Sequence, residues 1–195
     1  MKVVAINGSA RKNGNTATLI KAVFAALKDK GIETEMISLA GLKVRPCRAC
    51  FRCAEKQNRR CAVKDDDAND VIAKLEEADG IILGSPVYFA DVSAQLKCLI
   101  ERAGMTAKAN GDMFARKPAA AVVAVRRAGA VHTFDSINHF FLIGQMIVVG
   151  SSYWNVGYGR EPGAVKQDEE GMGIMKNLGK NMAWLLKRIE AKKEG

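Results

Sequence analysis

Four cysteines are crowded into one short stretch of this chain, with the spacing C-x2-C-x2-C-x7-C. Three thiolates at three-residue spacing on a tight loop can converge on one centre, and a fourth can close it. Bacterial iron–sulfur proteins begin with the same C-x2-C-x2-C spacing, so the pattern favours a 4Fe–4S site. A zinc site and a loop of free or redox-active thiols are the open alternatives. The four residues, in a predicted loop at about 44–65, are Cys47, Cys50, Cys53 and Cys61.

A polar segment at 8–16 follows the first apolar run and offers what a phosphate monoester needs. It combines hydroxyls, an amide, two cations and the free backbone N–H groups of a helix that starts there. It lacks the P-loop pattern of ATP hydrolases and the G-x-G-x-x-G dinucleotide fingerprint. The alternative is an ordinary helix start with polar loop residues. The candidate phosphate ligands are Ser9, Arg11, Lys12, Asn15 and Thr16.

Two more candidate segments follow the apolar runs at 80–84 and 118–125. Ligands of open α/β sheets bind outside the carboxyl ends of the strands, so these loops should flank the segment at 8–16. The first combines a proline with aromatic rings that suit a flat heteroaromatic ligand, with core or interface packing as the alternative. The second has arginines that could stabilise an anionic ring or a phosphate, and a glycine that allows close approach. The candidates are Pro86, Val87, Tyr88, Phe89, Arg126, Arg127 and Gly129.

The elements that must position these segments follow from hydrophobic periodicity. Short strand-like segments, four of them apolar runs and the one at 33–39 alternating, are each followed by a segment of helical period, which predicts a parallel sheet with helices on both faces. Residues 157–173 are predicted to be irregular, because they are rich in glycine and charge. The predicted strands are 2–7, 33–39, 80–84, 118–125 and 146–150, and the predicted helices are 15–30, 66–78, 93–104, 132–145 and 174–192.

The composition is that of a globular chain. Of its 195 residues, 48% are hydrophobic and 26% are charged, which suits a single domain spanning 1–195. We find no apolar run of about 18 residues and no signal peptide, so we expect a cytoplasmic protein with reduced thiols and no membrane span. The net charge of +9 is accompanied by no nucleic-acid-binding motif, so we expect no nucleic acid as a partner.

Three segments together resemble the NADPH-dependent FMN reductase family. They are G-S-x-R-x-x-G-N-T at 8–16, G-S-P-V-Y at 84–88 and Q-L-K at 95–97. The resemblance runs across nearly the whole chain, and with the cysteine motif added it is strongest to the iron–sulfur flavoprotein branch. It implies a flavodoxin-like, five-stranded parallel sheet in the order 2-1-3-4-5.

The resemblance also implies the cofactor and its ligands. Flavin mononucleotide (FMN) would place its phosphate at Ser9, Arg11, Asn15 and Thr16, its ring along 86–89, and the ring's far side against 126–129. Family members use NAD(P)H as electron donor and often form dimers or tetramers with the flavin near an interface. Self-association is therefore expected, with a ferredoxin or a quinone as further redox partners.

The function expected from these features is FMN-dependent electron transfer, fed by NAD(P)H or a ferredoxin-type donor. FMN carries the redox chemistry, so no side chain needs to act as general acid or base. The alternatives are a cluster-free NAD(P)H-dependent FMN or quinone reductase and a non-catalytic FMN electron carrier. A basic nucleic-acid-binding regulator with a redox-sensing cysteine loop is a more distant alternative.

Residues outside these motifs have structural explanations. Cys98 lies between leucines in a predicted helix and is expected to be a buried small residue. His132 and His139 are expected on a helix surface or at a subunit contact. Tyr153 and Trp154 follow the fifth predicted strand and are expected near the sheet edge, beside the cofactor or a neighbouring subunit.

Overall fold

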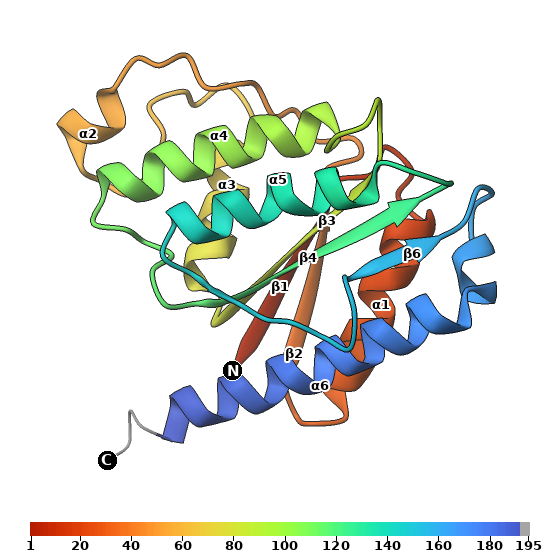
Figure 1. Cartoon of the computed structure of the whole chain (residues 1–195). Coiled ribbons are helices and arrows are strands. Elements are labelled where there is room, and N and C mark those ends of the chain that lie inside the picture. Colours follow the sequence, from red (N-terminus) through yellow and green to blue (C-terminus); the bar gives the residue numbers. More distant parts are fainter. Residues whose placement is uncertain (192–195) are drawn as a thin grey trace.

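A six-stranded parallel sheet forms the centre of the molecule (Figure 1). The computed structural model describes residues 1–191. Neighbouring strands follow the order β2-β1-β3-β4-β5, and a sixth strand also pairs with β4, so the order expected from the resemblance is confirmed. The strands are β1 Lys2–Asn7, β2 Glu33–Ser38, β3 Gly80–Pro86, β4 Pro118–Val125, β5 Ile147–Val148 and β6 Val156–Tyr158.

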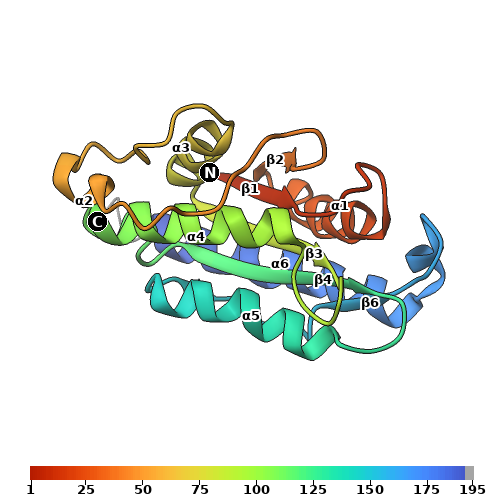
Figure 2. The same ribbon diagram turned by 90° about the horizontal axis from the view of Figure 1, so that it is seen from above.

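Helices cover both faces of this sheet. Helices α1 and α6 pack together on one face, and α3, α4 and α5 lie side by side on the other (Figures 1 and 2). Among residues 1–191, no helix is long and apolar enough to span a membrane. The helices are α1 Asn15–Lys28, α2 Arg52–Lys56, α3 Ala68–Glu77, α4 Ala94–Ala109, α5 Ala130–Ile143, the 3₁₀ turn η1 Ala164–Gln167 and α6 Glu169–Ala191.

Strand β1 shows why continuous apolar runs make this architecture. Successive side chains of a strand point to opposite faces. Val3 and Ala5 pack in the hydrophobic core beneath α1 and α6, whereas Val4 and Ile6 pack in the core beneath α3, α4 and α5. Both faces are buried, so a strand in this position needs apolar residues at every step.

The edge of the sheet beyond β4 was predicted as a single strand and is in fact interrupted. Ala119 pairs with Val148 and Val123 pairs with Val156. The edge segment therefore advances eight positions, from 148 to 156, while β4 advances four, from 119 to 123. The extra residues form a bulge between β5 and β6, which the buried Asn155 anchors by donating to the Ala121 carbonyl at 3.0 Å. The prediction that 157–173 is irregular was wrong at both ends, because β6 extends to Tyr158 and α6 begins at Glu169. A three-residue strand with a central glycine carries no alternation that could reveal it.

Three other predictions need correction. Helix α4 continues past Gly104 to Ala109, since Gly104 packs against the Phe140 ring rather than ending the helix. The short helix α2 inside the cysteine loop was not predicted. Cys98 is half-buried rather than buried, and burial raises the pKa of its thiol. The last residue of the predicted final helix, Lys192, lies outside the described residues.

Candidate functional site

The three predicted loops meet at the carboxyl edge of the sheet. The Gly8 N–H donates to the Gly84 carbonyl at 2.8 Å, and the Ser93 hydroxyl at the start of α4 donates to the Gly8 carbonyl at 2.6 Å. Gly129 lies against Val87, whose Cγ1 would be 3.1 Å from a Cβ added at Gly129. The segments after β1, β3 and β4 therefore form one continuous surface, as the sequence predicted.

The first loop presents backbone donors at the start of α1. The buried Ser9 hydroxyl accepts the Arg11 N–H at 3.1 Å and so holds the loop in a tight turn. The first helical hydrogen bond runs from the Thr18 N–H to the Gly14 carbonyl, which leaves the N–H groups of 15–17 without an acceptor in the helix. Arg11 is exposed and Thr16 is buried beside these groups. Such a helix start attracts anions.

Lys12 and Asn15 differ from the other predicted phosphate ligands. Lys12 is exposed, and its carbonyl accepts from the Asn7 amide. The Asn15 amide nitrogen donates to the carbonyls of Gly159 and Glu161 at 2.9 and 3.0 Å, and its oxygen accepts the Gly163 N–H at 2.7 Å. The Asn15 side chain thus holds a fourth loop, 159–165, against the predicted phosphate site. Only its backbone N–H is left to face an anion.

The loop after β3 ends in a tight turn with unusual backbone angles. Tyr88 and Asp91 exchange two backbone hydrogen bonds, of 2.9 and 3.2 Å, across Phe89 and Ala90. Both central residues have positive φ, 46° at Phe89 and 68° at Ala90, a conformation normally left to glycine, asparagine or aspartate. The Phe89 side chain is fully exposed at the tip of this turn. Strain of this kind is concentrated at functional sites.

The loop after β4 faces this turn. Arg126 and Arg127 are exposed, and Gly129 takes the left-handed conformation, φ 87°, directly before α5. His132, which the sequence placed on a helix surface, is exposed and lies 3.6 Å from the Asp91 carboxylate. Burial alone would raise the pKa of Asp91, but the Val92 N–H, Ser136 and His132 together hold it below its ordinary value.

An aromatic hollow adjoins these loops. Tyr153 and Trp154, from the bulge between β5 and β6, contact each other with ring centroids 4.9 Å apart and ring planes tilted by 55°. They line the hollow together with Tyr158 and the first residue of α5, Ala130, and the carboxylates of Asp168 and Glu170 lie on its rim. Both rings are about half exposed, so they lie at the sheet edge, as expected from the sequence. Flat apolar walls at this position can extend the surface available to a planar ligand.

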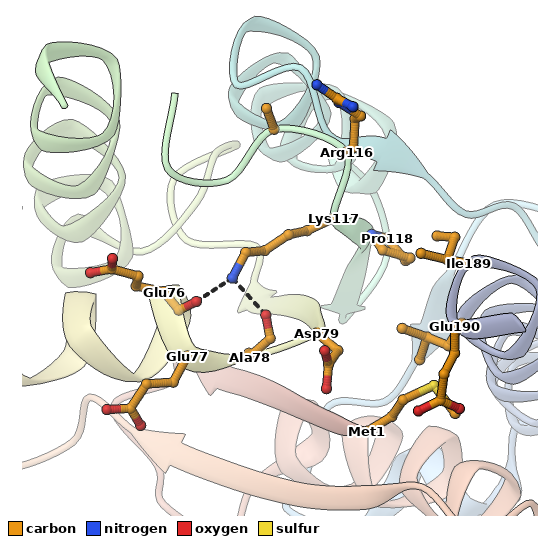
Figure 3. Close-up of a pocket in the computed structure, with 12 residues that line it drawn as sticks. Met1, Glu76, Glu77, Ala78, Asp79, Arg116, Lys117, Pro118, Ile189 and Glu190 are labelled. Atoms are coloured by element: carbon orange, nitrogen blue, oxygen red, sulfur yellow. Dashed lines mark hydrogen bonds between the residues drawn. The ribbon is translucent and has the colours of Figure 1, made fainter. Parts of the chain in front are cut away.

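A second hollow lies at the opposite, amino edge of the sheet (Figure 3). Lys117 donates there to the carbonyls of Leu75, Glu76 and Ala78 and so caps the end of α3. The residues around it include four carboxylates, Glu76, Glu77, Asp79 and Glu190. These carboxylates outnumber the cations Arg116 and Lys117 of the same lining, so this hollow suits a phosphorylated cofactor less well than the carboxyl edge does.

All four cysteines of the C-x2-C-x2-C-x7-C motif line a single small cavity between their loop and α4. One sulfur contact lies within the loop, where the Ala49 N–H is 3.4 Å from the Cys47 sulfur. Another reaches the neighbouring helix, where the Cys53 thiol donates to the Met105 carbonyl of α4 at 3.8 Å. The four cysteines therefore line the same cavity, as we expected from their spacing in the sequence.

The backbone of this loop differs from that of an ordinary surface loop. Of its cysteines, Cys53 is buried, Cys47 and Cys61 are half-buried and Cys50 is exposed. Ala49 and Phe51, on either side of Cys50, have positive φ of 49° and 55°. Alternating backbone conformations of this type turn N–H groups toward a common point and recur around Fe–S sites. Burial raises the pKa of the Cys53 thiol, and Cys61 and Cys47 add to the effect.

The donor set of the cavity suits an iron–sulfur cluster, because four thiols surround it and an N–H group already bonds one sulfur. Across the part of the chain that the structure describes, no three His, Cys, Asp or Glu side chains are placed to hold a single metal ion.

Helix α4 connects the two regions. Its first residues contact the loop at 8–16 through Ser93, and Met105 near its other end contacts Cys53 (Figure 1). Twelve residues of helix separate these two points, roughly 18 Å at 1.5 Å per residue. The candidate flavin surface and the cysteine cavity are therefore separate sites within one chain.

A donor-rich helix start beside aromatic and arginine-bearing loops, on a sheet of this order, defines a flavodoxin-like flavoprotein. The chain belongs to the NADPH-dependent FMN reductase family, whose sequence model matches residues 1–161. The resemblance seen in its motifs is thereby confirmed, and the protein is an FMN-dependent oxidoreductase.

Two relatives support this assignment, and a solved structure supports the fold. An iron–sulfur flavoprotein of Methanocaldococcus jannaschii is 42% identical over 202 residues, which cover 97% of this chain and 100% of that protein. One of Methanosarcina thermophila is 32% identical over 195 residues and covers 100% of both chains. Among solved structures, RosB with bound 8-demethyl-8-formylriboflavin-5'-phosphate superposes with a TM-score of 0.75 at 17% identity, over 98% of this chain and 81% of that one.

Sequence reasoning missed two features of the site. The 159–165 loop reaches the first loop through Asn15, a contact across 144 residues that no local pattern announces. Its glycines, at 159 and 163, were the available signal. The pairing of His132 with Asp91 was also missed, because the two residues lie on different elements.

Proposed function

We propose that FMN binds at the carboxyl edge, with its phosphate at the start of α1 and its ring between the Phe89 turn and the 126–129 loop. The proposal is supported by the free N–H groups of 15–17 and by the contact between Gly129 and Val87. Ser9, Arg11 and Thr16 would supply hydrogen bonds and charge to the phosphate. The exposed arginines Arg126 and Arg127, and the two aromatic side chains at 88 and 89, would flank the ring.

We also propose that Cys47, Cys50, Cys53 and Cys61 hold a 4Fe–4S cluster. The observation that carries this proposal is that all four thiols line one cavity. The names of the relatives from Methanocaldococcus jannaschii and Methanosarcina thermophila point the same way. Each thiolate would hold one iron, and the Ala49 N–H, which lies 3.4 Å from the Cys47 sulfur, would stabilise the charge on that ligand.

The proposed activity is electron transfer between a two-electron donor and a one-electron acceptor. FMN supplies this chemistry when bound, because a flavin accepts a hydride and releases electrons one at a time. The chain's own part is to bind the phosphate, to orient the ring and to shield it from water. The proposed donor is NAD(P)H or a ferredoxin-type protein, and a quinone or a ferredoxin is the proposed acceptor. A cluster-free reductase and a non-catalytic carrier are the rival functions.

Self-association is part of the proposal. Phe89 is fully exposed, and Tyr88, Tyr153 and Trp154 are 42% to 60% exposed around the same edge. Symmetric assembly is the usual way in which a soluble chain covers such a surface. We propose a dimer or tetramer, located in the cytoplasm, with neither nucleic acid nor membrane as a partner.

The cluster is tested by counting iron in variants prepared without oxygen. Replacing any one of the four motif cysteines by alanine should lower the iron and sulfide per chain and leave FMN bound, because the two sites are separate. NAD(P)H reduction of FMN should survive, whereas one-electron delivery to a protein acceptor should fall.

Cys98→Ala is the matched control, since Cys98 lies on α4 outside the cavity. This variant should contain as much iron as the wild type. Iron that stays bound in all four motif variants would refute the ligand assignment. Zinc in place of iron and sulfide in the wild type would support the tetrahedral zinc alternative instead.

A further inference from the structure

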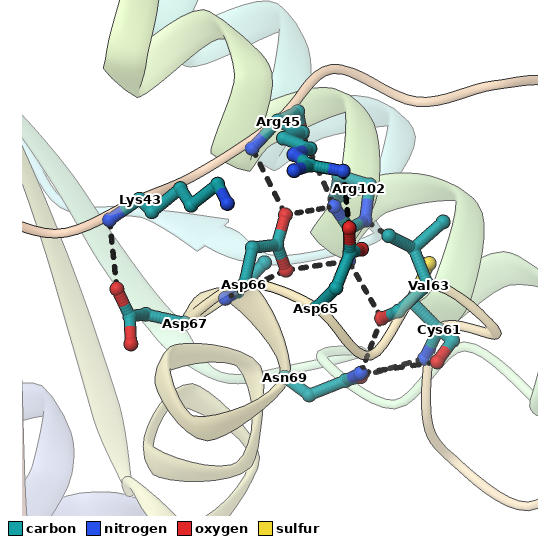
Figure 4. A network of polar contacts seen from close by, with 10 residues as sticks. Lys43, Arg45, Cys61, Val63, Asp65, Asp66, Asp67, Asn69 and Arg102 are labelled. Atoms are coloured by element: carbon teal, nitrogen blue, oxygen red, sulfur yellow. Dashed lines mark hydrogen bonds and ion pairs between the residues drawn. The ribbon is translucent and has the colours of Figure 1, made fainter.

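A buried arginine of α4 stands beside the cysteine cavity (Figure 4). Arg102 is 0% exposed, and all five of its N–H groups have acceptors. Nε donates to the Cys61 sulfur at 3.0 Å, Nη1 to the Arg45 carbonyl at 3.1 Å and to Asp66 Oδ2 at 2.8 Å, and Nη2 to the Val63 carbonyl and to Asp66 Oδ1, both at 3.2 Å. A buried guanidinium is tolerated only when it is paired and bonded in this way.

The pair stays ionised. The Asp66 side chain is also 0% exposed. Burial by itself would raise the pKa of its carboxyl group, but the hydrogen bonds from Arg102 and from the Arg45 N–H outweigh it and hold the pKa below the ordinary 3.8. The cation therefore remains fixed, with one of its N–H groups directed at a cysteine sulfur.

These contacts join the two ends of the cysteine loop. Arg45 precedes the first cysteine of the motif, whereas Cys61, Val63 and Asp66 lie at and after the last one. Arg102 reaches both ends from the rigid helix α4 (Figure 4). The loop is thus closed around its cavity by one side chain that also contacts a proposed iron ligand.

We propose that Arg102 is a positioning residue that fixes Cys61 and raises the reduction potential of the proposed cluster through its charge and its N–H···S hydrogen bond. This inference rests on the cluster proposed above. Reduction adds one electron and one unit of negative charge to the cluster and its thiolates, with no bond formed or broken. A nearby cation and a hydrogen bond to sulfur stabilise the added charge.

Replacing the two partners of the ion pair should shift the reduction potential of the proposed cluster in opposite directions. Arg102→Gln removes a positive charge and should lower the potential, whereas Asp66→Asn removes a negative charge and should raise it. Each change should alter the equilibrium constant for one-electron reduction by about tenfold, which is ~59 mV for a one-electron couple. A residue that only holds the loop would move both variants in the same direction, because both lose the pair.

The measurement is a reductive titration with dithionite and mediators on the anaerobic FMN-loaded protein, followed by the electron paramagnetic resonance signal of the reduced cluster. Arg52→Gln is the matched control, since Arg52 is an exposed arginine beside Cys53, and its change should be below about threefold because solvent screens it. If Arg102→Gln fails to fold, the direction of the shift in Asp66→Asn decides the test, since only a higher reduction potential supports the proposal.

Shifts of the same sign, or shifts no larger than the control, would overturn the proposal. Loss of iron from both pair variants with FMN retained would also overturn the tuning role, and would leave Arg102 a structural clamp. Absence of iron and sulfide from the reconstituted wild type would instead overturn the cluster itself, so the two failures are distinguishable.

Discussion

Replacing Asn15 by alanine should release the 159–165 loop from the start of α1. The Asn15 side chain links these segments through two donated hydrogen bonds and two accepted ones, from the Gly163 N–H at 2.7 Å and from the Val165 N–H at 3.4 Å. Alanine can make none of them. The loop then loses this polar attachment to α1 and keeps the Gly159 N–H bond to the Val125 carbonyl and the buried Val165 side chain, while the helix keeps its backbone hydrogen bonds.

The size of the effect follows from the three shortest of those bonds. Each has a donor–acceptor distance of 3.0 Å or less. At about 1 kcal/mol net for each hydrogen bond, the free energy of local opening should fall by about 3 kcal/mol. Because 1.4 kcal/mol corresponds to a factor of ten, protection of the Gly163 amide should decrease by about 100-fold.

The assay is amide hydrogen exchange of the protein without ligand, read at Gly163 and Val165 by NMR. Thr18→Ala is the matched control, because the Thr18 hydroxyl bonds only the Gly14 carbonyl within the same helix turn. The control should leave Gly163 protected. Unchanged exchange at Gly163 in Asn15→Ala would refute the conclusion that this side chain holds the loop.

Three further predictions concern the phosphate site, acid stability and assembly. Arg11→Ala combined with Thr16→Val should weaken FMN binding by about 2–4 kcal/mol in calorimetry and leave riboflavin binding almost unchanged, because only FMN carries the phosphate; equal losses would place the phosphate elsewhere. Because the pKa of Asp66 is lowered in the fold, its ionised carboxylate stabilises the protein above about pH 4, and this stabilisation is lost as the pH falls. The free energy of unfolding in urea, measured between about pH 5 and 2, should therefore decline less steeply in Asp66→Asn than in wild type. Sedimentation should give a dimer or tetramer that retains FMN, and a stable monomer with tightly bound FMN would contradict the proposed assembly.

The centre of the sheet was predictable because β1, β3 and β4 are buried on both faces. Runs such as 80–84 and 118–125 have almost no polar residue, and only a strand covered by helices on both sides calls for such a run. The edge strand was harder, because β5 and β6 are short and the bulge between them carries no periodic signal. The convergence of the cysteines was also predictable, since their spacing is local.

Long-range polar contacts were beyond sequence reasoning. Arg102 bonds Asp66 across 36 positions, and nothing in the periodicity of α4 separates a buried arginine from an exposed one. The Asn15 side chain looked like a phosphate ligand because its partners, Gly159 and Gly163, lie far along the chain. Single side chains that join distant segments are visible only once the fold brings those segments together.

The account's central claim is one flavin and one cluster in each chain, at separate sites. It is tested most directly by measuring FMN, iron and acid-labile sulfide together in protein purified and reconstituted without oxygen. We predict about one FMN, four irons and four sulfides per chain. Protein with a full complement of FMN and no iron or sulfide would contradict the claim and leave a cluster-free FMN reductase.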